Sequence, residues 1–157
     1  MQVRQLLRMK HTTVAPQTHV DRVWKLLERR DISLVPVVDK NRKLVGVIGE
    51  DDLLYRLVPD YYEYFSMFFP EVPNEKDLED KLAKEVAMIA TDVMEHKVVV
   101  ALPEELLFSA LSRMMVHHVR QLPVVDDDGK YLGMIIEDDI MKYLFQKHSH
   151  LVKGKKS

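Results

Sequence analysis

The chain contains an internal repeat, and this repeat constrains the fold more than any other feature of the sequence. The segment SLVPVVDKNRKLVGVIGEDDLL, residues 33–54, returns as RQLPVVDDDGKYLGMIIEDDIM, residues 120–141, at a constant offset of 87 residues. The identical positions at this offset are Pro36/Pro123, Val37/Val124, Val38/Val125, Asp39/Asp126, Lys43/Lys130, Gly46/Gly133, Ile48/Ile135, Glu50/Glu137, Asp51/Asp138 and Asp52/Asp139. An ungapped recurrence of this kind indicates two copies of one structural unit.

Both copies predict the same order of elements. A β-prone stretch, at 12–14 or 98–100, precedes a proline, after which an amphipathic helix is expected, with Thr18 as the N-cap in the first copy. Two short apolar runs separated by a polar turn then predict a hairpin, over 34–48 or 121–136. A second helix is expected to begin at each Glu-Asp-Asp sequence, because carboxylates stabilise the positive end of the helix dipole.

Neither copy is expected to form a core on its own. Each spans about fifty to sixty residues, a length at which a lone hydrophobic core is marginal. We therefore expect an α/β fold of the α+β type, in which two β-α-β-β-α repeats pack as a pseudo-twofold pair with a helical insert between them. The expected divisions are a first repeat at 1–57, an aromatic and helical insert at 58–88, a second repeat at 89–147 and a disordered basic tail at 148–157.

The insert is the part of the chain that the repeat does not explain. Its first half, VPDYYEYFSMFFPEVP, carries six aromatic residues between prolines, and its second half predicts a helix capped by Asn74. The aromatic residues are expected to pack against apolar surface. That surface can belong to the core of the pair, to another subunit or partner, or to a ligand that the insert covers.

Composition and charge exclude several classes of protein. The formal net charge of −2 argues against a general nucleic-acid binder, which would carry a basic excess. The absence of cysteine excludes disulfides, thiol catalysis and cysteine metal sites. No apolar run suits a signal peptide or a membrane span, so we expect a cytoplasmic protein without membrane contact. The histidines at 117–118 and 148–150 lack a convergent third ligand, and no metal site is expected.

The two copies resemble the CBS domain (cystathionine-beta-synthase domain) in the PVVD motif, the glycine after the hairpin turn and the acidic start of the last helix. Together they are similar to a tandem CBS pair, or Bateman module, over about 3–57 and 89–145. The resemblance implies a regulatory binding module and not an enzyme. It implies AMP, ADP, ATP or S-adenosylmethionine as a regulatory ligand in clefts between the repeats, with no required cofactor. It also implies a homodimer, which can act on a separately encoded enzyme or transporter.

The resemblance further implies which residues contact the ligand. The aspartate at the start of the last helix, Asp52 or Asp139, is expected to accept hydrogen bonds from the ribose hydroxyls. The family's phosphate-contacting threonine or serine, three residues earlier, is replaced by Gly49 in the first copy and by Ile136 in the second. Gly49 leaves room and still offers a backbone N–H to an anion, whereas Ile136 supplies bulk without a hydroxyl.

The other family positions are also shared unequally between the copies. Thr13 keeps a family threonine that Val100 replaces in the second copy. Arg120 stands where a basic residue would reach phosphate, and Ser33 occupies that place in the first copy. The expected apolar walls for adenine are Val35, Pro36, Leu122 and Pro123. Because its phosphate end lacks the isoleucine, the site that uses Asp52 is favoured.

Structural interpretations of the same residues stay open. The two aspartates also suit carboxylates that stabilise only their own helices, and Arg120 suits a solvated or ion-paired arginine. The run Glu50-Asp51-Asp52 is not expected to bind Mg²⁺, because adjacent helix residues point to different faces. If ligand binding has been lost, the chain would be a structural or dimerisation module whose aromatic insert is the functional surface.

Overall fold

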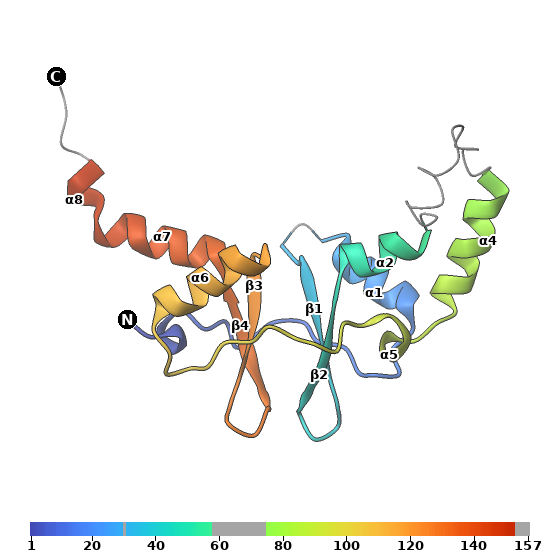
Figure 1. Cartoon of the computed structure of the whole chain (residues 1–157), viewed down its shortest axis with the longest axis horizontal. Coiled ribbons are helices and arrows are strands. Elements are labelled where there is room, and N and C mark those ends of the chain that lie inside the picture. Colours follow the sequence, from blue (N-terminus) through green and yellow to red (C-terminus); the bar gives the residue numbers. More distant parts are fainter. Residues whose placement is uncertain (30, 58–74, 153–157) are drawn as a thin grey trace. The chain divides into compact units, whose positions relative to one another are not determined.

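The computed structural model describes residues 1–29, 31–57 and 75–152, and the chain forms two compact units. The central unit, Thr12–Val98, contains the first repeat. The terminal unit consists of Met1–His11 together with Val99–Ser157, so the N-terminal residues complete the second repeat and not the first. Each unit has its own hairpin sheet (Figure 1). Each also has its own core of buried apolar side chains.

The central unit is built on one antiparallel hairpin with helices packed against it. Its elements are α1 (Val20–Leu27), β1 (Leu34–Val38), β2 (Leu44–Gly49), α2 (Glu50–Leu57), α4 (Glu75–Val86) and α5 (Ala90–Val93). Helix α4 confirms the helix expected in the second half of the insert. The aromatic half of the insert and the proposed cap at Asn74 lie outside the described residues.

The terminal unit repeats this plan. Its elements are η1 (Val3–Gln5), α6 (Leu107–His117), β3 (Gln121–Val125), β4 (Tyr131–Ile136), α7 (Glu137–Lys147) and α8 (Ser149–Val152). The short helix α8 occupies part of the segment expected to be a disordered tail, and residues 153–157 lie outside the described residues. The mixed α/β fold with two hairpins confirms the expected fold class.

The two hairpins have the same register and the same turn. Both strand pairs have their irregularity between the fourth and fifth residues of the first strand. In each turn an aspartate Oδ1 accepts hydrogen bonds from the backbone N–H groups two and four residues later, at 2.8 and 3.0 Å for Asp39 and at 2.9 Å each for Asp126. Aspartate favours such turns because its short side chain reaches the following backbone. The sequence repeat is therefore a structural repeat.

The strand expected at the start of each repeat is reduced to a single parallel bridge. Val14 bridges Val37 in the central unit, and Ala101 bridges Val124 in the terminal unit. The Val14 N–H donates to the carbonyl oxygen of Pro36 at 3.0 Å. Each hairpin thus gains a third chain segment, although each sheet remains two-stranded.

The N-cap predicted at Thr18 is wrong. Helix α1 begins at Val20, with His19 as its N-cap residue. The Thr18 hydroxyl instead accepts a hydrogen bond from the backbone N–H of Ala15 at 3.1 Å. A threonine hydroxyl can bond a nearby backbone group in a turn instead of capping a helix. Here the Thr18 hydroxyl bonds the turn before α1 and does not cap the helix.

The short segment that precedes each repeat packs in the unit of the other repeat. Residues 2–11 and 89–98 are related by the same 87-residue offset and make equivalent pairings. Arg8 forms an antiparallel bridge with Met134, and Glu95 forms the corresponding bridge with Val47. The terminal unit is therefore assembled from two segments that are distant in the sequence, whereas the central unit is one continuous segment.

Glycine is needed where these segments pass the hairpins. A Cβ atom added to Gly133 would lie 2.3 Å from the carbonyl oxygen of Arg8, a contact with backbone. A Cβ atom added to Gly46 would lie 2.5 Å from the Sδ atom of Met94, a contact with a flexible side chain. The glycine shared by the two copies thus permits close approach of the preceding segment.

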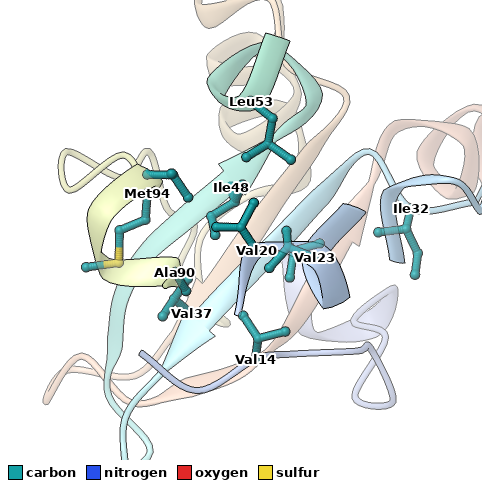
Figure 2. Close-up of a cluster of buried hydrophobic side chains, with 11 residues drawn as sticks. Val14, Val20, Val23, Ile32, Val37, Ile48, Leu53, Ala90 and Met94 are labelled. Atoms are coloured by element: carbon teal, nitrogen blue, oxygen red, sulfur yellow. The ribbon is translucent and has the colours of Figure 1, made fainter. Parts of the chain in front are cut away.

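Each unit has an apolar core. In the central unit Val20, Val23, Ile48 and Leu53 are fully buried, and Figure 2 shows them gathered in one cluster of side chains. The corresponding cluster of the terminal unit is Val3, Ala101, Leu107, Ala110, Met114, Leu122, Val124, Ile135 and Ile140. Burial of such side chains contributes about 1.5–3 kcal/mol each, so both clusters stabilise their units strongly.

Helix α4 also buries a carboxylate. Glu85 is 2% exposed, and neither of its side-chain oxygens has a hydrogen-bond partner in the part of the chain that the structure describes. Burial raises the pKa of this carboxyl above its ordinary 4.5, and the nearby Arg56 lowers it. A carboxyl whose pKa is raised on folding holds its proton more tightly in the folded state, so it lowers the stability as the pH rises above 4.5.

Glu85→Gln is expected to increase the free energy of unfolding by about 1 kcal/mol at pH 7, because it removes a buried charge that lacks hydrogen bonds. The difference from wild type should shrink as the pH falls below 4.5, because Glu85 then becomes protonated in the unfolded as well as the folded state. Urea unfolding at several pH values measures both effects. A Gln variant that is less stable at pH 7 would show that the carboxylate is stabilising, and Glu79→Gln on the exposed side of α4 is the matched control.

Candidate functional site

Asp52 lies in the first turn of α2, directly after β2. Its Oδ2 atom accepts a hydrogen bond from the backbone N–H of Gly49 at 2.7 Å, and in the described part of the chain this is its only hydrogen bond. Burial raises the pKa of this carboxyl, and the Gly49 N–H lowers it; Glu95 and Asp51 raise it further, while Arg56 lowers it. Asp52 is thus a half-buried carboxylate whose Oδ1 atom can accept from a ligand.

The residues predicted to surround Asp52 come from the adjoining ends of β1 and β2. Gly49 pairs with Leu34, the first residue of β1. A Cβ atom added to Gly49 would lie 3.7 Å from both the Asp52 Oδ2 atom and the carbonyl oxygen of Ser33, which is ordinary van der Waals contact. The structure therefore brings Ser33, Gly49 and Asp52 together, with space for a small group beside the carboxylate.

Strand β1 and the segment before α1 contribute the other predicted contacts of this site. Val35 is fully buried in the core cluster, so at this position β1 offers a ligand its backbone. Pro36 is also buried, and its carbonyl oxygen accepts from Val14. Thr13 is exposed and adjoins that bridge.

The equivalent aspartate of the terminal unit has a different partner. Asp139 lies in the first turn of α7, and Arg8 bonds both of its oxygens, from Nε to Oδ2 at 2.6 Å and from Nη2 to Oδ1 at 2.7 Å. Bidentate pairs of this kind are the strongest arginine–carboxylate contacts. Both oxygens of Asp139 therefore already accept a hydrogen bond from the chain itself, whereas Asp52 has one such oxygen.

The other predicted residues of the second copy also have partners within the terminal unit. Arg120 donates from Nε to Glu137 at 3.1 Å and from Nη2 to Asp138 at 3.2 Å. Ile136 is buried at the start of α7. The predicted adenine walls Leu122 and Pro123 are buried within β3. The predicted ligand contacts of the two copies thus differ more in their surroundings than the sequences indicated.

The two aspartates differ in the charge of one residue that lies at equivalent positions in the two units. At the 87-residue offset Arg8 corresponds to Glu95, and both lie on the segment that bridges the hairpin. The position that carries a guanidinium to Asp139 therefore carries a carboxylate near Asp52. Sequence reasoning missed this reversal of charge, although extending the offset to residues 1–11 would have revealed it.

The remaining candidate groups form no site. The rings of His148 and His150 lie 6.1 Å apart, and His117 and His118 end α6. In residues 1–29, 31–57 and 75–152 no three His, Asp or Glu side chains gather in a way that could hold a metal ion. No helix in the same ranges is both long enough and apolar enough to cross a membrane.

Comparison with known proteins gives one family. Residues 3–59 and 90–146 match the family described as CBS domain. An uncharacterized protein of Methanocaldococcus jannaschii is 31% identical over 133 residues, which cover 78% of this chain and 79% of that protein. The chloroplastic CBS domain-containing protein CBSX2 of Arabidopsis thaliana is 28% identical over 138 residues, which cover 85% of this chain and 58% of that protein. The chain thus spans little more than half of the plant protein.

Solved structures show the same fold. CBSX2 in complex with AMP aligns with a TM-score of 0.70 and 28% identity, covering 94% of this chain and 98% of that one. A CBS domain pair in complex with 5-methylthioadenosine and S-adenosyl-L-methionine aligns with a TM-score of 0.66 and covers 94% of this chain and 98% of that one. At 21% identity this second likeness concerns the fold alone.

Proposed function

Because the chain belongs to the CBS domain family, we propose that it is a regulatory module that binds an adenosine-containing ligand beside Asp52. The ligand is AMP, ADP, ATP or S-adenosylmethionine, and the module is cytoplasmic and catalyses no reaction. The complex of CBSX2 with AMP, at 28% identity, supports this choice of ligand. The bound state is passed to a partner, such as a separately encoded enzyme or transporter.

The proposal rests on the Oδ1 atom of Asp52, which is available to accept a hydrogen bond from a ligand. In the described part of the chain its Oδ1 atom accepts no hydrogen bond, and Gly49 leaves space beside it. Thr13 is exposed, and the Gly49 N–H is close enough to change partner when a ligand arrives. Asp139 lacks these properties because Arg8 holds both of its oxygens. We therefore propose one ligand site per chain.

Isothermal titration calorimetry with AMP, ADP, ATP and S-adenosylmethionine tests the proposal, with one molecule bound per chain as the expected result. Absence of binding for all four ligands, by protein shown to be folded, would contradict it. A regulatory role also requires that the ligand bind two arrangements of the module with different affinity, because equal affinity shifts no equilibrium. A ligand-dependent change in hydrogen exchange would report such a shift.

An exposed apolar surface supports a second function, homodimerisation. We define the apolar face as Phe108, Met115 and Val116 of α6 with Met141 and Phe145 of α7. The three residues of α6 are 66%, 67% and 73% exposed. Met141 and Phe145 of α7 are 44% and 57% exposed. Large apolar side chains exposed on two helices in contact are typical of an interaction site.

The first repeat shows that the fold does not require this face. The positions equivalent to Phe108, Met115 and Val116 hold Asp21, Glu28 and Arg29, and α1 still packs on its hairpin. The three apolar residues on α6 therefore serve something other than the core. We propose that the same face of a second copy covers them, because a face without charge pairs with itself without repulsion.

Replacing Phe108 by Asp and Met115 by Glu together is expected to weaken self-association at least a hundred-fold, because each charge would be buried in an apolar interface. Sedimentation velocity over a range of concentrations measures the change. Unfolding midpoints at low concentration, where both proteins are monomers, should be nearly equal because both residues are exposed. A wild-type protein that is monomeric at high concentration would overturn the proposal, and Glu28→Gln on α1 is the matched control.

A further inference from the structure

We infer that Glu95 determines the specificity of the Asp52 site, favouring adenosine compounds that carry no phosphate or a positive charge over AMP, ADP and ATP. The inference rests on the proposed adenosine site. It concerns which members of that ligand class bind, and it follows from the charges that the structure gathers around Asp52.

The position of Glu95 is defined by its backbone. Its N–H donates to the carbonyl oxygen of Val47 at 2.8 Å, and its own carbonyl oxygen accepts from the Val47 N–H at 3.1 Å. Arg8 makes the same pair of bonds with Met134, at 2.9 and 3.0 Å. The two residues are thus held at equivalent backbone positions by equivalent hydrogen bonds.

The contact made by Arg8 shows what a side chain at this position can reach. From its bridge with Met134, Arg8 bonds Asp139 directly, from Nε to Oδ2 at 2.6 Å and from Nη2 to Oδ1 at 2.7 Å. Asp52 occupies the equivalent place at the start of α2, three residues after Gly49. The Glu95 side chain starts from the equivalent backbone position beside β2, and its negative charge raises the pKa of Asp52.

The charges around Asp52 are mainly negative. Asp51 and Glu95 act on it as anions, and Arg56 acts as a cation. The Arg56 guanidinium donates from Nη2 to the carbonyl oxygen of Asp92 at 2.9 Å, which ties it to the backbone near α5. Ser33 stands where the second repeat has Arg120, so this position offers no cation for phosphate. The Glu95 Oε1 atom accepts a hydrogen bond from the backbone N–H of Lys97 at 2.8 Å.

This arrangement has a direct consequence for the ligand. A ribose held by Asp52 carries its 5′ substituent a few ångströms away, where the Glu95 field repels a phosphate and attracts a sulfonium or ammonium group. At an effective dielectric constant between those of protein and water, one such charge changes affinity by about five-fold. The expected order of affinity is S-adenosylmethionine first, then adenosine, AMP, ADP and ATP.

Calorimetric titrations of the full chain with these five compounds, in 0.15 M salt with EDTA and no divalent cation, test the inference. In Glu95→Gln the affinity for AMP should rise about five-fold relative to that for adenosine. The control Glu79→Gln makes the same change of net charge on α4 and should leave this ratio as in wild type. In Glu95→Arg the new guanidinium should bond Asp52 as Arg8 bonds Asp139, weakening adenosine at least ten-fold.

Each result bears on a different claim. Affinity that rises with the number of phosphates, or a ratio unchanged in Glu95→Gln, would overturn the role of Glu95 and leave the adenosine site standing. Adenosine binding unchanged in Glu95→Arg would show that the side chain does not reach Asp52 and would overturn the inference as well. Failure of all five compounds to bind the folded wild-type chain would overturn the adenosine site itself.

Discussion

Gly133→Ala is expected to destabilise the protein by about 3 kcal/mol, the upper range of the cost of overpacking. The added methyl group would lie 2.3 Å from the Arg8 carbonyl oxygen and 2.9 Å from its carbonyl carbon. That oxygen accepts a hydrogen bond from the Met134 N–H at 3.0 Å, so the backbone cannot move aside without losing the bridge. The Arg8–Asp139 ion pair depends on the same segment.

Thermal unfolding measures this effect, and a fall in midpoint of about 10 °C is expected for a chain of this size. The three glycines of the two strands form a graded series. Gly46→Ala meets a flexible methionine side chain and should cost less, while Gly49→Ala meets nothing closer than 3.7 Å and should be nearly neutral. Equal midpoints for all three variants would show that the N-terminal segment does not pack against β4 in solution.

Asp52→Ala is expected to weaken binding of an adenosine ligand about 100-fold. A carboxylate that accepts from ribose hydroxyls makes charge-assisted hydrogen bonds, each of which contributes about 1.5–3 kcal/mol. Loss of one or two such bonds corresponds to one to several factors of ten in the dissociation constant. Titration of the variant with the ligand that binds wild type best measures the change.

Two other aspartates, Asp51 and Asp139, are the controls for this variant. Asp51→Ala removes the same charge from an exposed position one residue earlier and should change affinity only slightly. Asp139→Ala breaks the ion pair with Arg8, so it should lower stability more than ligand affinity. If Asp139→Ala weakened binding more than Asp52→Ala, the choice of site would be refuted.

The parts of the fold that depend on local chemistry were predictable from the sequence. The apolar runs and the turn aspartates Asp39 and Asp126 indicated hairpins at 34–48 and 121–136, where the structure has β1–β2 and β3–β4. The starts of α2 and α7 at Glu-Asp-Asp were predicted because carboxylates stabilise the positive end of the helix dipole. The packing of residues 1–11 with the second repeat was not predictable, because no local pattern distinguishes packing with the first repeat from packing with the second.

The candidate site was predictable to a similar extent. The place of Asp52 beside Gly49 follows from a three-residue separation across a strand–helix junction. The partner of Asp139 stands 131 residues away in the sequence, and only the tertiary structure brings it there. Arg120 could be read as a phosphate ligand or as an ion-paired arginine, and Glu137 and Asp138 now account for it.

The exchange of N-terminal segments also bears on the order in which the chain folds while it is being synthesised. The central unit is contiguous, so all of its parts exist once residue 98 has been made. Residues 1–11 can pack only after β4 has been synthesised, because Arg8 bridges Met134 of that strand. Contacts of such long sequence separation form slowly. Domains generally fold as units from the N-terminal side during translation. Residues 1–11 are synthesised before the central unit and pack only after it.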